Sequence, residues 1–265
     1  MTDPVLIATD RRGIATVTLN RPEVNNAYDG ALIAALAAGL DRLAKEPGLR
    51  LVVLRGNGRH FQAGADLAYL RHLSAAPEDE NLAFSRATVS VIDALWNFPR
   101  PTIALIHGGC FGGGVGMVAA CDMAVASADA IFSLTEVRWG ITPAPIVPAL
   151  VAAIGTRALA RYGLTAERFD ADEALRIGLL HATCPVGGFD TAAAPLIDGI
   201  LMAAPEAVAV TKRLVREAAG TATSAEFRDT LAVEAATRRH SEEAREGLAS
   251  FAEKRKPAWY PGKGD

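Results

Sequence analysis

The sequence is poor in the residues that build metal centres and disulfide frameworks. It has three cysteines in 265 residues, Cys110, Cys121 and Cys184, and they show no C-x-x-C or zinc-ligand spacing. The five histidines are dispersed and form no H-E-x-x-H motif. We therefore expect buried, reduced thiols and no metal site.

A strong charge of one sign and a long apolar run are also lacking. The net charge is −3, so no basic excess indicates a nucleic-acid partner. No uninterrupted apolar stretch approaches the roughly 20 residues of a membrane-spanning helix. Residues Met1–Pro4 lack the basic and apolar segments of a secretion signal. These absences predict a cytoplasmic globular protein without nucleic-acid or membrane partners.

What the sequence does contain is a pair of glycine-marked turns. Each turn follows a short apolar run typical of a buried strand, Leu51–Leu54 for His60–Leu67 and Thr102–Ile106 for His107–Gly114. Each also precedes a predicted helix. Two strand–turn–helix units of this kind can direct backbone N–H groups at one point, where an anionic oxygen would be stabilised.

The second turn matches none of the common glycine motifs. Gly112–Gly114 has neither the G-x-G-x-x-G spacing of a dinucleotide site nor the Gly-Lys-Ser/Thr of a P-loop. It also lacks the G-x-S-x-G nucleophile elbow. Close helix–strand packing explains these glycines equally well when they are taken alone. Paired with Ala63–Asp66, they favour an oxyanion site.

Two carboxylates lie close to these turns in the sequence. Asp66 is at the position of a helix cap, which we favour over a catalytic role. Glu136 follows the second turn and has apolar neighbours, Phe132 and Trp139. It is either a surface glutamate paired with Arg138 or a partly buried general acid/base.

The remaining pattern alternates strands with helices and predicts an α/β fold with a parallel sheet. We expect an N-terminal hairpin, a helix from Asp29 to Lys45, a mobile loop from Ser74 to Asn81 over a pocket, and a helix from Phe84 to Phe98. From Pro205 onward, four helical stretches are expected. The two strand–turn–helix units begin 51 residues apart, which suggests a repeated superhelical unit.

These motifs resemble the enoyl-CoA hydratase/isomerase (crotonase) family over nearly the whole chain. The resemblance implies a crotonase-type repeated ββα superhelix with a C-terminal helical region. Residues 1–200 would form the core with the CoA site and oxyanion hole, and residues 201–265 a helical oligomerisation region. It also implies a homotrimer or homohexamer, and no cofactor, because coenzyme A is part of the acyl-CoA substrate.

The resemblance implies roles for individual residues. The N–H groups of Ala65 and Gly113 would hold the thioester oxygen, with Glu136 as the catalytic carboxylate. Asn20–Ala27 resembles a segment that lines the CoA path, and Phe251 and Lys254 resemble residues that approach the CoA adenine and 3′-phosphate, often from a neighbouring subunit. The implied CoA-binding residues are Val24, Asn25, Ala27, Ala63, Asp66, Leu67, Phe251 and Lys254.

One position departs from the family pattern. Hydratases of the family usually carry a further glutamate three residues after the second oxyanion glycine, where this chain has Gly116. Isomerases of the family resemble this chain in having one glutamate at the site. Bacterial 3-methylglutaconyl-CoA hydratase-like proteins also resemble this chain and tolerate glycine there. By that resemblance, Gly116, Arg138 and Trp139 would line the acyl pocket, with Arg138 facing a distal substrate carboxylate or, equally, forming an exterior salt bridge.

We therefore expect a hydratase of an α,β-unsaturated acyl-CoA that acts in fatty acid metabolism or leucine degradation. A branched or dicarboxylic acyl group is the hypothesis for its substrate. An enoyl-CoA isomerase that uses a single glutamate is the first alternative. A non-catalytic acyl-CoA-binding protein is the second.

Overall fold

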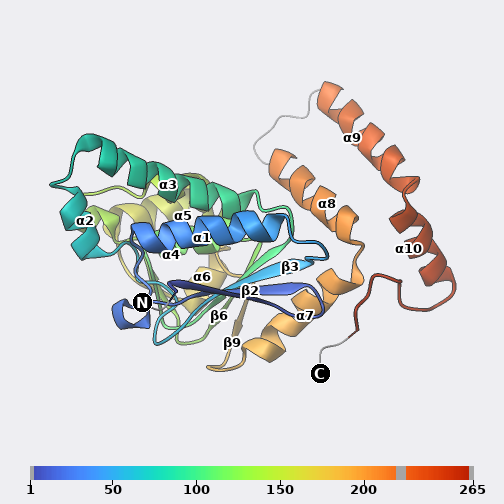
Figure 1. Cartoon of the computed structure of the whole chain (residues 1–265), viewed down its shortest axis with the longest axis horizontal. Coiled ribbons are helices and arrows are strands. Elements are labelled where there is room, and N and C mark those ends of the chain that lie inside the picture. The colour runs from blue at the N-terminus through green and yellow to red at the C-terminus, as the bar shows by residue number, and fades with distance from the viewer. Residues whose placement is uncertain (1–2, 219–224, 263–265) are drawn as a thin grey trace.

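The computed structural model describes residues 3–218 and 225–262 and shows a mixed α/β fold with a separate group of helices at the C-terminal side (Figure 1). A six-stranded sheet has the order β1-β2-β3-β4-β6-β9. Its strands are β1 (Val5–Thr9), β2 (Ile14–Leu19), β3 (Leu51–Gly56), β4 (Thr102–Ile106), β6 (Met123–Ser127) and β9 (Ala182–Cys184). A three-stranded sheet has the order β5-β7-β8. Its strands are β5 (Gly109–Phe111), β7 (Ile131–Ser133) and β8 (Phe169–Asp170).

Strand pairing follows the sequence pattern. Strands β1 and β2 form the expected antiparallel hairpin, in which Val5 lies opposite Leu19. All later pairs in the six-stranded sheet are parallel. Parallel strands are covered on both faces and so read as continuous apolar runs, as Leu51–Leu54 does. The predicted α/β class with a parallel sheet is confirmed.

Seven helices belong to the core: α1 (Gly30–Ala44), α2 (Leu67–Leu73), α3 (Glu78–Trp96), α4 (Gly113–Ala120), α5 (Val147–Thr165), α6 (Ala171–Arg176) and α7 (Phe189–Met202). Three 3₁₀ turns connect them: η1 (Pro22–Val24), η2 (Glu136–Trp139) and η3 (Ala144–Ile146). Side chains of alternating strand residues divide between the two faces of the sheet. Val52 and Leu54 pack in the main core, while Leu51 and Val53 pack with residues of α7.

The expected helix after Asp29 forms because its apolar residues fall on one face. Leu32, Leu36, Leu40 and Leu43 are all buried in the main core. The Asp29 carboxylate accepts the N–H of Leu32 at 2.9 Å and caps the helix. This prediction is confirmed to within one residue at each end.

Two predictions about local structure are wrong. The expected mobile loop from Ser74 to Asn81 becomes helical at Glu78, where α3 begins. Pro77 precedes the helix, and acidic residues in the first turn favour the helix macrodipole, so the polar composition marked a helix start. From Pro205 onward the described residues contain three helices, not four: α8 (Pro205–Ala218), α9 (Ala225–Arg239) and α10 (Glu242–Ala252).

Helix α5 belongs to a long segment of high mean hydropathy. By length and composition alone, the segment Ala144–Thr165 would suffice to cross a membrane. In the structure, Gly155 interrupts the helix with φ 69° and ψ 165°. Leu150 and Ile154 of this segment are buried in the main core, so one side of the helix packs against the domain.

Candidate active site

The first glycine-marked turn is held in place by backbone pairing with Tyr28. The N–H of Tyr28 donates to Gly64 O at 2.9 Å, and the N–H of Asp66 donates to Tyr28 O at 2.8 Å. The buried Gln62 side chain accepts from the Gly64 N–H at 2.6 Å. The N–H of Ala65, which lies between Gly64 and Asp66, has no acceptor within residues 3–218 and 225–262. This amide is therefore available to a ligand.

The second turn places another such amide at the start of a buried helix. Gly112 has φ 50°, a left-handed value that favours glycine, and its N–H donates to Ser133 O at 2.9 Å. Gly113 is the first residue of α4, and its N–H has no acceptor among the described residues. All eight residues of α4 are buried. The helix dipole adds partial positive charge at this amide.

The two turns are in contact. Gln62 and Cys110 form a parallel bridge, with the Phe111 N–H donating to Gln62 O at 2.9 Å. A Cβ atom built on Gly64 would lie 3.3 Å from Phe111 O and 3.9 Å from Gly112 Cα. The segments that carry the Ala65 and Gly113 amides therefore meet, as the sequence predicted.

Glu136 lies against the second turn. It begins η2 and is 9% exposed. A Cβ atom built on Gly112 would lie 3.1 Å from Glu136 Oε1. Glu136 Oε2 is buried without a hydrogen-bond partner. Burial raises the pKa of this carboxyl above its ordinary value. A buried, unpartnered carboxylate beside two free amides can act as an acid or a base on a molecule bound there.

A cavity of about 1090 Å³ joins these groups. Its wall includes Ala65, Gly113 and Glu136, and it continues along α3 and η3. The wall is mostly apolar, and Arg86 and Glu136 carry its formal charges. A pocket of this size, with a few convergent polar groups, suits an elongated acyl substrate.

The other predicted binding residues divide into two groups. Ala63, Leu67 and Trp139 line the cavity. Val24, Asn25 and Ala27 are not in its wall. They precede Tyr28, and Asn25 O accepts the Ala63 N–H at 3.0 Å, which ties this segment to the first turn.

Asp66 has the capping geometry that the sequence favoured. Its carboxylate accepts the N–H groups of Ala68 and Tyr69 at 3.0 and 3.2 Å and pairs with Arg21 at 3.4 Å. These contacts fix the start of α2 and hold the first turn in position. The cap interpretation of Asp66 is confirmed.

Two predicted acyl-pocket residues lie elsewhere. Gly116 is buried but does not line the cavity, because a Cβ atom at this position would overlap the Ile146 side chain. Arg138 is exposed and is also absent from the wall. Phe251, which is 85% exposed, and Lys254 lie at the end of α10, outside the cavity of their own chain.

The cavity residues that were not predicted from the sequence include Tyr28, Arg86 and Ile146. Tyr28 has a local signal, since it directly follows the segment that resembles the CoA path. Arg86 lies within the helix predicted from Phe84 to Phe98, but no local signal places it at a cavity. Ile146 has no local signal, because its contact with Gly116 joins residues 30 positions apart.

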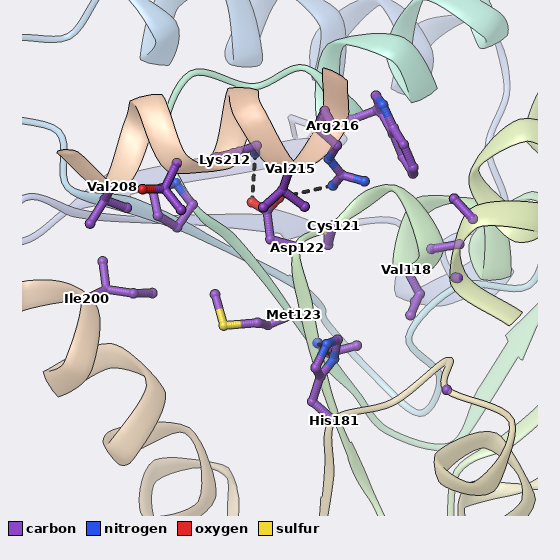
Figure 2. Close-up of a pocket in the computed structure, with 18 of the residues that line it drawn as sticks. Val118, Cys121, Asp122, Met123, His181, Ile200, Val208, Lys212, Val215 and Arg216 are labelled. Atoms are coloured by element: carbon purple, nitrogen blue, oxygen red, sulfur yellow. Dashed lines mark hydrogen bonds and ion pairs between the residues drawn. The ribbon is translucent and has the colours of Figure 1, made fainter. Parts of the chain in front are cut away.

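A second cavity of about 690 Å³ lies between α8 and the core (Figure 2). Its lining is mainly apolar, and Asp122 is paired there with Lys212 at 2.7 Å and with Arg216 at 3.0 Å. It contains neither the free amides nor Glu136. The chemistry therefore belongs to the larger cavity.

The enoyl-CoA hydratase/isomerase family model matches residues 9–262, and the chain belongs to this family of lyases and isomerases. The structure superposes on the crystal structure of an enoyl-CoA hydratase from Shewanella pealeana with a TM-score of 0.92 and 35% identity, covering 97% of this chain and 96% of that one. The predicted crotonase fold is confirmed.

Relatives of both reaction types are found. The chain is 32% identical over 257 residues to mevalonyl-coenzyme A hydratase of Aspergillus fumigatus, covering 94% of this chain and 92% of that protein. It is also 32% identical over 193 residues to a mitochondrial Δ(3,5)-Δ(2,4)-dienoyl-CoA isomerase of Rattus norvegicus, covering 69% and 59%. The chain therefore belongs to an enzyme family that includes hydratases and isomerases.

Proposed function

We propose that this chain hydrates an α,β-unsaturated acyl-CoA, with Glu136 as its single catalytic carboxylate. The observation that carries the proposal is the buried, unpartnered Glu136 Oε2 in the wall that also holds the Ala65 and Gly113 amides. The hydratase relative named above matches the chain nearly end to end, whereas the isomerase relative matches about two thirds of it.

In this proposal the two amides polarise the thioester carbonyl. Polarisation withdraws electrons from the conjugated C=C bond and makes C3 electrophilic. Ionised Glu136 takes a proton from water as the water oxygen forms a bond to C3, and the C=C electrons move onto the thioester oxygen as an enolate. The same carboxyl then returns the proton to C2, and the thioester carbonyl re-forms. The net change is the addition of one water molecule.

The single-carboxylate arrangement is enforced by packing. Position 116 cannot bring a second carboxylate to the cavity, because any side chain there meets Ile146. Glu136 must then serve both as base toward water and as acid toward C2. Its raised pKa suits both tasks, since a general acid/base works best when its pKa approaches the operating pH.

The test is the decay of the conjugated thioester absorbance with a panel of 2-enoyl-CoA substrates. We expect turnover by the wild type and a loss of about 10³-fold or more with Glu136→Gln, which keeps the shape and removes the base. Tight binding of the panel without turnover by the wild type would instead support the acyl-CoA-binding alternative.

The isomerase is the second candidate, and the sealed position at Gly116 favours it. A shuttle of one proton between C2 and C4 needs one carboxylate and no activated water. A 3-enoyl-CoA substrate separates the two reactions. An isomerase converts it at once to the conjugated 2-enoyl product, whereas a hydratase leaves it unchanged.

We propose further that the acyl group is branched or dicarboxylic, as in leucine degradation. For a dicarboxylic substrate, we propose Arg86 in place of Arg138 as the partner of the distal carboxylate. Arg138 is outside the cavity, whereas Arg86 lines it and has no acidic partner among the described residues. An Arg86→Gln variant should raise KM for a dicarboxylic enoyl-CoA and leave a straight-chain monocarboxylic one unchanged. An equal rise for both would place Arg86 at a CoA phosphate instead.

A further inference from the structure

The Tyr28 side chain reaches from one oxyanion segment to the other. Its backbone is bridged to Ala65. Its ring lies against the start of α4, where a Cβ atom built on Gly113 would be 2.6 Å from both the hydroxyl oxygen and Cε1. Since a C–C bond is about 1.5 Å long, the hydroxyl lies within about 4 Å of Gly113 Cα. Gly113 thus leaves room for this phenol.

The hydroxyl has no partner in the protein. Tyr28 is 8% exposed, yet its oxygen forms no hydrogen bond with any described residue. The hydroxyl oxygen is not fully enclosed by protein atoms, and Tyr28 lines the larger cavity. A phenol O–H buried this far normally finds an acceptor. The one open direction is the cavity, so the missing acceptor belongs to the molecule that binds there.

The surroundings keep this hydroxyl a donor. Burial, and after it the negative charge of Glu136, raise the pKa of the phenol well above its ordinary value. The hydroxyl is therefore protonated at neutral pH. It is therefore suited to donate a hydrogen bond to a developing anion and unsuited to act as a base.

Building on the acyl-CoA chemistry proposed above, we infer that the Tyr28 hydroxyl is a third hydrogen-bond donor to the thioester oxygen, beside the Ala65 and Gly113 amides. The donor strengthens as negative charge develops on that oxygen in the enolate. This assigns Tyr28 a catalytic contact that neither glycine turn shows by itself.

The test uses Tyr28→Phe, which removes one oxygen and keeps the ring stacked near Phe84, 6.2 Å away between centroids. The matched control is Tyr69→Phe. Tyr69 belongs to the same aromatic cluster, but its hydroxyl lies by Gly30 and it does not line the cavity. We expect kcat to fall at least about tenfold in Tyr28→Phe, toward the 10²–10³ of a lost oxyanion donor, with KM nearly unchanged. The control should keep the wild-type kcat.

A spectroscopic readout separates donation from packing. Cinnamoyl-CoA absorbs at longer wavelength when its carbonyl is polarised, and a Glu136→Gln background prevents turnover. The red shift on binding should be smaller with Tyr28→Phe added and unchanged with Tyr69→Phe added. Wild-type kcat in Tyr28→Phe together with an undiminished red shift would overturn the inference. A wild type that turns over no enoyl-CoA would contradict the proposed function instead, whatever the red shift.

Discussion

Helices α4 and α8 show two different ways of joining a helix to this protein. Every residue of α4 is buried, and the helix enters the core with its first amide at the active-site cavity. Helix α8 buries none of its residues and is joined to the core largely through polar contacts. Figure 1 shows α8, α9 and α10 beside the sheet-containing body.

The polar contacts of the C-terminal region with the core include clusters at two points. Asp122 binds Lys212 and Arg216 of α8, as Figure 2 shows. Arg50, at the other point, donates to four backbone carbonyls in the C-terminal part of the chain at 2.8 to 3.2 Å: those of Ile200, Leu201, Ala203 and Trp259.

The comparison of α4 with α8 shows which helix must be held in an exact position for the active site. Close packing around α4 holds the Gly113 amide in the position that an oxyanion site requires, because a densely packed interior leaves little room for displacement. Ionic attachment of α8 fixes its position while several apolar side chains of the C-terminal region stay exposed, including Val215, Leu248 and Phe251. We propose that these side chains meet neighbouring subunits of a trimer or hexamer.

Among the variants that test the comparison of α4 with α8, the largest effect is expected from a methyl group at the start of α4. In Gly113→Ala the new Cβ would lie 2.6 Å from Tyr28, so the ring or the first turn of α4 must move. Displacing one oxyanion amide should lower kcat by about 10²–10³. Gly199→Ala is the control, because its Cβ meets no atom within 4 Å. Steady-state kinetics of both variants check this, and equal activity would refute the packing argument.

Asp122→Asn should produce the next largest effect, on stability. The substitution leaves Lys212 and Arg216 mostly buried without a carboxylate. Breaking such a pair costs about 3 kcal/mol, measured as the free energy of unfolding in urea. Asp41→Asn is the control, since its pair with Lys45 is exposed and should contribute less than about 0.5 kcal/mol. Similar losses in both variants would show that α8 is not held by Asp122.

The pH dependence of activity and that of stability should separate the catalytic from the structural effect of burying Glu136. Burial raises the pKa of this carboxyl above its ordinary value of 4.5. Only the ionised form takes a proton from water, so kcat/KM should fall about tenfold per pH unit below that raised pKa. A flat activity profile across this range would contradict Glu136 as the base.

The raised pKa of Glu136 affects stability in the opposite direction from activity. Because the folded-state pKa is higher than the unfolded one, the contribution of Glu136 is complete below the unfolded-state pKa and is lost as pH rises through the folded-state pKa. The melting temperature of Glu136→Gln minus that of the wild type should therefore increase with pH. A difference independent of pH would mean that the carboxyl is not buried in solution.

The smallest effect on folding is expected from Phe251→Ser. This side chain is 85% exposed, so the unfolding free energy should change by less than about 0.5 kcal/mol. If the C-terminal region contacts a neighbouring subunit and its CoA, sedimentation should show weaker assembly and KM should rise. Unchanged assembly and KM would remove Phe251 from both roles.

The sequence was most informative where strong apolar spacing, a cap or a glycine pattern determines structure locally. Apolar runs predicted β3 and β4, and the spacing of leucines together with Asp29 predicted α1. The glycine patterns predicted two turns whose amides meet. Each of these features depends on residues close together in the chain.

The rest of the site depends on residues that meet only in the folded chain. The contact of Gly116 with Ile146 seals a position where a family pattern suggested an acyl pocket. Arg138 and Trp139 are neighbours in η2, yet only Trp139 lines the cavity, since a short turn directs adjacent side chains differently. The position of the Tyr28 hydroxyl beside the start of α4 likewise becomes apparent only in the folded structure.

The most direct test of the site is exchange of the C2 protons of butyryl-CoA in D₂O, followed by NMR. This substrate cannot be hydrated or isomerised, so exchange reports only on the carboxylate and the polarised thioester. We predict exchange with the wild type and a rate lower by about 10³-fold with Glu136→Gln. Exchange at the wild-type rate in Glu136→Gln would contradict a site built from that carboxylate and the amides of residues 65 and 113.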